Sequence, residues 1–103
     1  MAVRLHVEAE RELRAAVDWY EDRRAGLGAE LRGEVVTAFE RITRFPLAAP
    51  IDRAGTVAAF NVRRQLVARF PYAVAYRLRA DDILVVAIAH TSQAPGYWAR
   101  RVR

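Results

Sequence analysis

Two kinds of spacing divide the chain, a helical one in its first half and an alternating one in its second. Apolar residues recur every three or four positions over residues 8–24, at Ala9, Leu13, Ala16, Val17 and Tyr20. A second stripe of this period runs over residues 29–45, at Leu31, Val35, Ala38, Phe39 and Ile42. Each stripe predicts an amphipathic helix. Gly26 and Gly28 predict a tight turn between the helices, and Pro46 predicts the end of the second.

Beyond a predicted loop at residues 46–58, the pattern changes to the period of two that is typical of strands. A first strand is predicted over residues 60–70. Residues 74–79 alternate apolar side chains with arginine, and residues 83–89 form an unbroken apolar run, as in an inner strand. Asp81 and Asp82 predict the turn between these two strands. We expect the helices to cover the sheet face that carries Val62, Leu66, Val74, Tyr76 and Leu78.

The order of the elements predicts an α+β fold with two layers. A helical hairpin packs on one face of a three- to four-stranded, antiparallel-type sheet, and a short C-terminal tail follows. Residues 2–6 supply a possible fourth strand, which would flank the last strand. At 103 residues we expect a single domain, spanning residues 1–103.

The charge is concentrated in the second half of the chain. Nine acidic residues and eight arginines give residues 1–50 a net charge of −1, whereas three acidic residues and nine arginines give residues 51–103 a net charge of +6. All seventeen basic residues are arginine and there is no cysteine, so lysine and thiolate chemistry and disulfides are excluded. Arginine suits the recognition of phosphate and carboxylate groups better than proton transfer.

Four arginines are candidates for recognition. With ordinary antiparallel pairing they would share the sheet face that the helices leave open, where clustered guanidinium groups would attract a nucleic acid or an acidic protein segment: Arg63, Arg69, Arg77 and Arg79. The alternative is a solvated face whose arginines reflect genome composition.

Aromatic residues and one histidine complete the candidate set. Trp19 lies beside the apolar stripe of its helix and could anchor a partner. Tyr97 and Trp98 could contact bases or a partner, or they could pin the tail to the core. His90 ends the inner strand and is a candidate general acid or base, with a structural hydrogen-bonded histidine as the alternative.

The sequence contains no signal for a metal site, a membrane span or a signal peptide. No spacing of His, Asp and Glu predicts a metal site, and we expect no cofactor. No stretch reaches the roughly 18 apolar residues of a membrane span, and charged residues follow the first few positions where a signal peptide would be apolar. These features favour a cytoplasmic protein without a membrane partner.

Four segments together resemble the ParE/RelE superfamily of type II toxins, on its ParE or plasmid-stabilisation branch. They are AVDWYEDRRAGLG at residues 16–28, ERITRFP at 40–46, RRQLVARFPYAVAYRL at 63–78 and ILVVAIAHTSQAPGYW at 83–98. The resemblance implies a growth-inhibiting bacterial toxin that a small antitoxin neutralises with its C-terminal part, in a hetero-oligomer. ParE-like members poison DNA gyrase, whereas RelE-like members cleave mRNA in the ribosomal A site.

The residues that distinguish these activities favour the ParE-like branch. RelE-like nucleases place an arginine directly after the tyrosine that enters the central hairpin, where this chain has Ala73, and basic residues after the last strand, where it has Ser92 and Gln93. Some nucleases of the superfamily use a histidine at the position of His90, which keeps the ribonuclease alternative open. A toxin-fold protein that retains only antitoxin binding is a third alternative. Because the second half is basic, the antitoxin should carry an acidic or disordered C-terminal segment.

Overall fold

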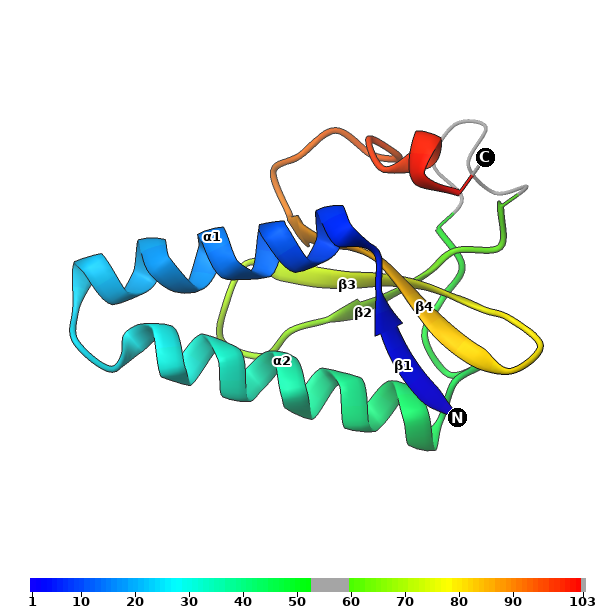
Figure 1. Cartoon of the computed structure of the whole chain (residues 1–103), viewed down its shortest axis with the longest axis horizontal. Coiled ribbons are helices and arrows are strands. Elements are labelled where there is room, and N and C mark those ends of the chain that lie inside the picture. Colours follow the sequence, from blue (N-terminus) through cyan, green and yellow to red (C-terminus); the bar gives the residue numbers. More distant parts are fainter. Residues whose placement is uncertain (53–59, 103) are drawn as a thin grey trace.

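The computed structural model describes residues 1–52 and 60–102. Residues 53–58 of the predicted loop therefore lie outside the described residues. The chain forms strands and helices in the predicted order (Figure 1): β1 (Ala2–Leu5), α1 (Val7–Arg23), α2 (Leu27–Arg44), β2 (Arg63–Leu66), β3 (Tyr72–Leu78), β4 (Asp82–His90) and the 3₁₀ turn η2 (Ala99–Arg101). The α+β architecture with two helices on a sheet is confirmed.

The helical hairpin closes at Gly26 and is packed tightly at Gly28. His6 caps the start of α1, where its Nδ1 accepts a hydrogen bond of 3.0 Å from the backbone N–H of Glu8. Gly26 has a φ of +89°, which favours glycine, and precedes the first turn of α2. Gly28 lies inside α2 instead of in the connecting turn, so that expectation was wrong. A Cβ at Gly28 would lie 2.6 Å from the carbonyl oxygen of Val17, which shows how closely the two helices approach there.

The four strands form one sheet in the order β1-β4-β3-β2. β2, β3 and β4 are antiparallel as expected, and β1 flanks β4 as expected. The β1–β4 pair is parallel, with Val3 opposite Ile83, so the sheet is mixed and the antiparallel-type prediction was wrong for this pair. β1 and β4 are separated in sequence by two helices and two strands, so the connection does not determine whether they pair parallel or antiparallel. The alternation of side chains along β1 would be the same in either direction.

A register shift in β4 explains part of its unbroken apolar run. Ala75 lies opposite Ala87 while the next residue, Tyr76, lies opposite Val85, so Val86 is an extra residue in β4. Val86 and Ala87 both belong to the core on the side of the C-terminal tail, although they are neighbours in sequence.

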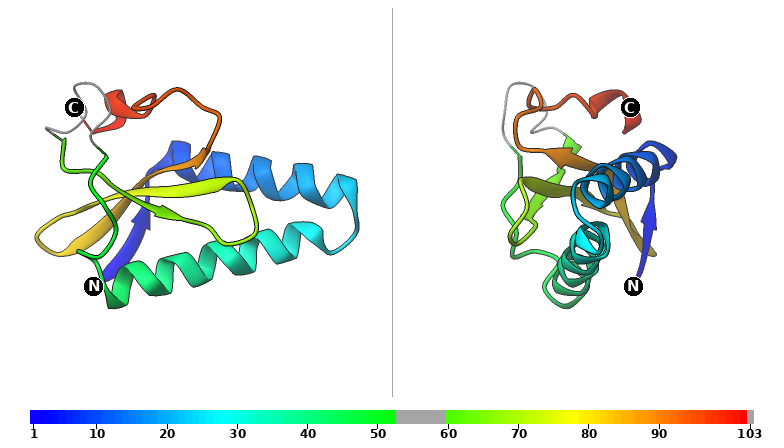
Figure 2. Two further views of the ribbon diagram at one scale, coloured as in Figure 1. Left: turned by 180° about the vertical axis from the view of Figure 1, so that it is seen from behind. Right: turned by 90° about the vertical axis from the view of Figure 1, so that its left-hand side faces the viewer.

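The sheet is covered on both faces. One core, the helix-side core, joins α1 and α2 to the sheet and includes Leu13, Leu31, Val35, Ile42, Val74, Tyr76, Ile83 and Val85. The other, the tail-side core, joins the sheet to the C-terminal segment and includes Val62, Ala75, Val86, Ala87, Ala89 and Trp98. Figures 1 and 2 show α1 and α2 antiparallel against the sheet, with the C-terminal turn near the start of α1.

The predicted orientation of β2 was wrong. Arg63 and Gln65 lie opposite Tyr76 and Val74, whose side chains belong to the helix-side core, so Val62 and Leu66 lie on the other face. Val62 is buried in the tail-side core, and Leu66 is exposed. Alternation in sequence identifies two faces of a strand but cannot tell which of two covered faces meets the helices.

No helix in the described part of the chain is long and apolar enough to cross a bilayer.

Candidate functional site

The four candidate arginines do not share an open face. Arg63 donates to the carbonyl oxygens of Leu47 (3.2 Å) and Ala49 (2.8 Å). Arg77, on the tail side, lies 3.4 Å from the carbonyl oxygen of Val102. The prediction that the four arginines share one open face was therefore wrong. The side chain of Arg63 lies on the helix side of β2, and the C-terminal segment covers the face that was expected to be open.

The other two arginines are held by carboxylates. Arg69 pairs with Glu30 (2.7 Å) and Glu34 (3.3 Å) of α2. Its φ of +69° takes it out of the strand alternation on which the expected face depended. The hydrogen bond from Arg69 lowers the pKa of Glu30, and the pKa of Arg69 is raised in turn.

Arg79 forms two hydrogen bonds to Asp82, of 2.6 and 2.7 Å, across the β3–β4 turn. Arg79 thereby lowers the pKa of the Asp82 carboxyl. All four candidate arginines thus have acceptors within the chain, with which a polyanion would have to compete.

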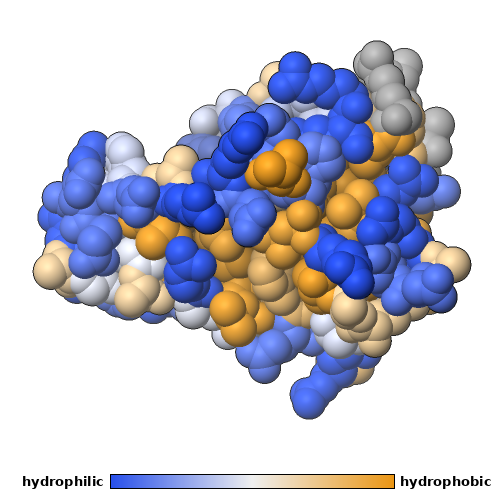
Figure 3. Space-filling model, viewed as in Figure 1, coloured by the Kyte–Doolittle hydropathy of each residue, from blue (hydrophilic) through white to orange (hydrophobic). Residues whose placement is uncertain are grey.

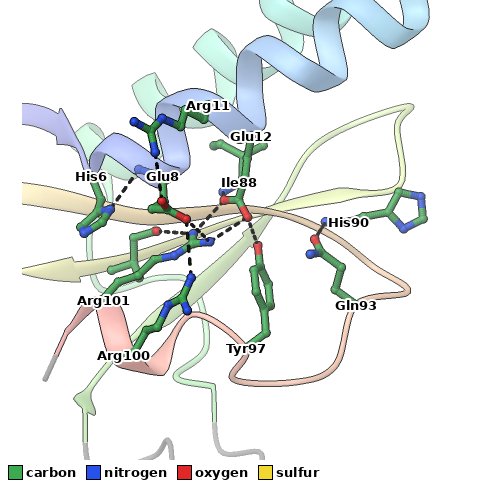
Figure 4. A network of polar contacts seen from close by, with 11 residues as sticks. His6, Glu8, Arg11, Glu12, Ile88, His90, Gln93, Tyr97, Arg100 and Arg101 are labelled. Carbon is green, nitrogen blue, oxygen red and sulfur yellow. Dashed lines mark hydrogen bonds and ion pairs between the residues drawn. The ribbon is translucent and has the colours of Figure 1, made fainter.

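A polar network centred on Glu12 joins α1, β4 and the C-terminal tail (Figure 4). The Glu12 carboxylate accepts hydrogen bonds from the Tyr97 hydroxyl (2.6 Å), from Arg101 (2.9 and 3.1 Å) and from the backbone N–H of Ile88 (3.1 Å). The Arg101 side chain is only 6% exposed and also donates to the carbonyl oxygen of Val86 at 3.0 Å. Side chains that are far apart in the sequence therefore meet in one partly buried site.

This network forms hydrogen bonds with the backbone edge of β4 beyond the point where β1 ends. The β1–β4 pairing stops at Leu5 and Val85, and the N–H of His6 makes a last hydrogen bond of 2.9 Å to the Val85 carbonyl oxygen. Beyond that point, Arg101 and Glu12 bind the backbone groups of Val86 and Ile88. The tail is thus fixed to polar groups that β1 is too short to reach.

Glu12 and Arg101 could not be recognised as site residues from the sequence pattern. Glu12 reads as an ordinary acidic residue in the first turns of a helix, and Arg101 as one of several arginines in a tail. They are 89 positions apart, and no local pattern connects them.

Tyr97 and Trp98 hold the C-terminal tail against the rest of the domain, which was one of the two expected roles. Trp98 is 2% exposed in the tail-side core, with its ring 6.5 Å from that of Phe60. Burial raises the pKa of the Tyr97 hydroxyl, and the hydrogen bond to Glu12 raises it further. In this structure Trp98 has no face open to a base or a partner.

The raised pKa of Tyr97 predicts a loss of stability in alkali. Unfolded tyrosine ionises near pH 10, whereas Tyr97 in the folded chain keeps its proton, so its contribution is complete below about pH 10 and is lost as the pH rises further. We expect the free energy of unfolding of the wild type to fall more steeply above about pH 10 than that of Tyr97→Phe. Urea unfolding from neutral to alkaline pH measures this, and parallel curves would contradict it.

His90 is arranged as a hydrogen-bond donor. Its Nδ1 accepts the backbone N–H of Ser92 at 3.0 Å and lies 2.7 Å from the Ser92 hydroxyl oxygen. A backbone N–H can only donate, so Nδ1 carries no proton, and in the neutral ring the proton sits on Nε2. Nε2 can then donate, but it cannot accept a proton from a substrate as a general base.

Three positions where RelE-like nucleases carry cationic groups, residues 73, 92 and 93, hold neutral side chains here. Ala73 is completely buried in β3, so a guanidinium would not fit there without rearrangement. Ser92 and Gln93 both bind His90, the latter through its side-chain oxygen and the His90 N–H at 2.8 Å. Among the described residues, no group of three or more acidic or histidine side chains could hold a metal ion.

Trp19 is half-exposed, as expected from its place beside the apolar stripe, and lies next to a cavity. The Arg23 guanidinium lies 3.8 Å from the centre of the Trp19 ring, in a cation–π contact. The cavity, which we call the α1 pocket, has a volume of about 410 Å³. It is lined by Glu12, Ala15, Ala16, Trp19 and Tyr20 of α1 and by Tyr72, Ile88, His90 and Gln93 opposite. Two candidate residues, Trp19 and His90, are brought together here, apart from the arginines.

Comparisons with known proteins agree with this architecture. A family model described as the ParE toxin of the type II toxin–antitoxin system parDE matches residues 3–95. A solved structure titled "Chromosomal ParDE TA system from P. aeruginosa" is similar in fold, with a TM-score of 0.67 and 17% identity over 87% of this chain and 95% of the other. No curated protein sequence matches. The family match spans almost the whole chain, and we conclude that the chain belongs to the ParE toxin family of type II toxin–antitoxin systems.

Proposed function

We propose that this ParE-family toxin arrests growth by poisoning DNA gyrase and that a cognate antitoxin neutralises it. The family match over residues 3–95 carries the proposal, because ParE-like toxins differ from their RelE-like relatives in this target. Gyrase acts on DNA in the bacterial cytoplasm, which is where we place the toxin.

The local geometry supports a binding toxin over a ribonuclease. Cleavage of a phosphodiester bond needs a base near the ribose hydroxyl and cations near the phosphate. His90 presents a donor instead of a base, and Ala73 is buried where a nuclease would carry an arginine. Arg77 and Arg79 already have acceptors within the chain.

Two surfaces are suited to the antitoxin. β1 is an edge strand, and within the described residues its outer edge has no partner strand, so an extended segment could add to the sheet there. Apolar residues gather on the face formed by α1, α2 and β1 (Figure 3). The exposed side chains of Val7 and Val36 belong to these elements. An antitoxin with an acidic or disordered C-terminal segment would complement the formal net charge of +5 in a hetero-oligomer.

A supercoiling assay tests the target. Purified toxin should inhibit the supercoiling of relaxed plasmid by gyrase, and an equimolar amount of the antitoxin encoded beside it should restore the reaction. Normal supercoiling at a molar excess of folded toxin would contradict the gyrase proposal. Primer extension on mRNA from arrested cells tests the alternative, because cleavage in the ribosomal A site that is lost in His90→Ala would favour the nuclease.

A further inference from the structure

The α1 pocket has the shape of a socket for one bulky side chain. Its α1 wall follows one face of the helix, at positions 12, 15, 16, 19 and 20. The small side chains of Ala15 and Ala16 lie between the larger ones of Glu12 and Trp19, so they leave a hollow against Ile88 of β4. Its volume of about 410 Å³ falls in the range of cavities that bind small ligands and anchoring side chains.

Aromatic rings form much of the wall. Trp19 and Tyr20 meet edge to face at 4.9 Å, Tyr20 and Tyr72 at 6.3 Å, and Tyr72 and His90 at 5.2 Å between ring centres. An aromatic ring bound in the pocket could pack edge to face or offset against these rings, which are the arrangements that aromatic pairs prefer. The half-exposed Trp19 stands at the rim, where an anchor of a protein interface is typically found.

The polar groups around these rings are mostly donors without acceptors. Among the described residues, no hydrogen bond engages the hydroxyls of Tyr20 and Tyr72, and His90 has Nε2–H to donate. The Arg23 guanidinium over Trp19 has no carboxylate partner within residues 1–52 and 60–102. The Tyr72 hydroxyl is protonated at neutral pH, as in any tyrosine, and burial raises its pKa further. An occupant should therefore bring acceptors next to its ring.

We propose that the α1 pocket receives an aromatic side chain from an acidic peptide segment, with a neighbouring carboxylate of the peptide accepting from Arg23 and the tyrosine hydroxyls. The proposal rests on the proposed function, since the antitoxin is the expected source of such a segment. A peptide fits better than a nucleic acid. A nucleic acid brings one phosphate with every nucleotide, whereas none of the residues that line the pocket is an arginine and Arg23 contacts only its Trp19.

Nuclear magnetic resonance with a synthetic peptide tests the pocket without the antitoxin. The probe is an acetylated and amidated peptide with a central phenylalanine between aspartate and glutamate residues, titrated into the full-length ¹⁵N-labelled toxin made by cell-free synthesis. We expect saturable shifts of the Trp19 indole N–H and of the amides of residues 15–20 and 88–93. Replacing the phenylalanine of the peptide by alanine, or its acidic residues by lysine, should weaken binding at least about tenfold.

A substitution that fills the pocket provides the matched test. Ala15 is exposed on α1, so Ala15→Leu should keep the fold and weaken peptide binding at least about tenfold, while the same change at the exposed Ala29 of α2 should leave binding unchanged. Trp19→Ala removes the rim and should also weaken binding. Absent shifts, shifts confined to α2 or to the β1 edge, or unchanged binding to folded Ala15→Leu would overturn the proposal.

The two proposals can fail separately. If wild-type toxin binds the antitoxin and inhibits gyrase but the peptide does not reach the pocket, only the pocket is refuted. If the peptide binds at the pocket while gyrase supercoils normally, the gyrase target is refuted and the pocket is supported.

Discussion

Trp98→Ala should lower the free energy of unfolding by about 4 kcal/mol, because it truncates a large buried side chain. Trp98 is 2% exposed and joins the C-terminal segment to Ala75, Val86 and Ala87 of the sheet and to Val62, which precedes β2. Truncation leaves a cavity in a small core that has few other large side chains, and the segment loses its apolar attachment. Domains of this size are stable by only about 5–15 kcal/mol, so the effect on the urea midpoint should be large.

Trp19→Ala is the matched control for this measurement. It removes the same side chain from a half-exposed position, where the fold depends on it much less. We expect a loss within about 1 kcal/mol. Equal losses for the two tryptophans would contradict the assignment of Trp98 to a core.

Glu12→Ala should lower the free energy of unfolding by about 3 kcal/mol. It removes the acceptor of three donor groups, namely the Tyr97 hydroxyl, the Arg101 guanidinium and the Ile88 N–H. Arg101 is 6% exposed and would lose its close carboxylate, keeping only the more distant one of Glu8 at 3.7 Å, and removing one partner is the costly way to break a buried ion pair. Equilibrium unfolding in urea at neutral pH measures the loss.

Glu10 offers a control on the same helix, because it is exposed and Glu10→Ala should change stability by no more than about 0.5 kcal/mol. A double-mutant cycle with Arg101→Ala isolates the pair. The double variant should be more stable than the sum of the single losses predicts, by about 1–3 kcal/mol. Additive losses would mean that Glu12 and Arg101 do not act on each other.

The helices and the hairpin could be predicted from the sequence because their patterns are local. The stripes that contain Leu13 and Val35 fix which side of each helix is buried, and both lie in the helix-side core. The alternation of Val74 and Tyr76 with Arg77 fixes the two faces of β3. The direction of β1 and the orientation of β2 depend on long-range pairing, which these patterns do not contain.

Features of the candidate site could be predicted only where they depend on a residue and its neighbours in sequence. The exposure of Trp19 followed from its position beside an apolar stripe. The arginine face failed because it assumed that one side of the sheet was open, whereas Trp98 and its neighbours fill that side. The role of His90 depends on a hydrogen bond to Ser92, which sequence alone does not reveal.

The pairing of β1 with β4 has a consequence for the order in which the protein can fold during synthesis. β1 is made before α1, α2, β2 and β3, yet its partner in the sheet is β4, which follows all of them, and the clamp between Glu12 and Arg101 closes over 89 positions. A chain that emerges from the ribosome can form its helical hairpin early, but it holds β1 unpaired until β4 follows. The sheet is therefore complete only after β4 has been added to the growing chain.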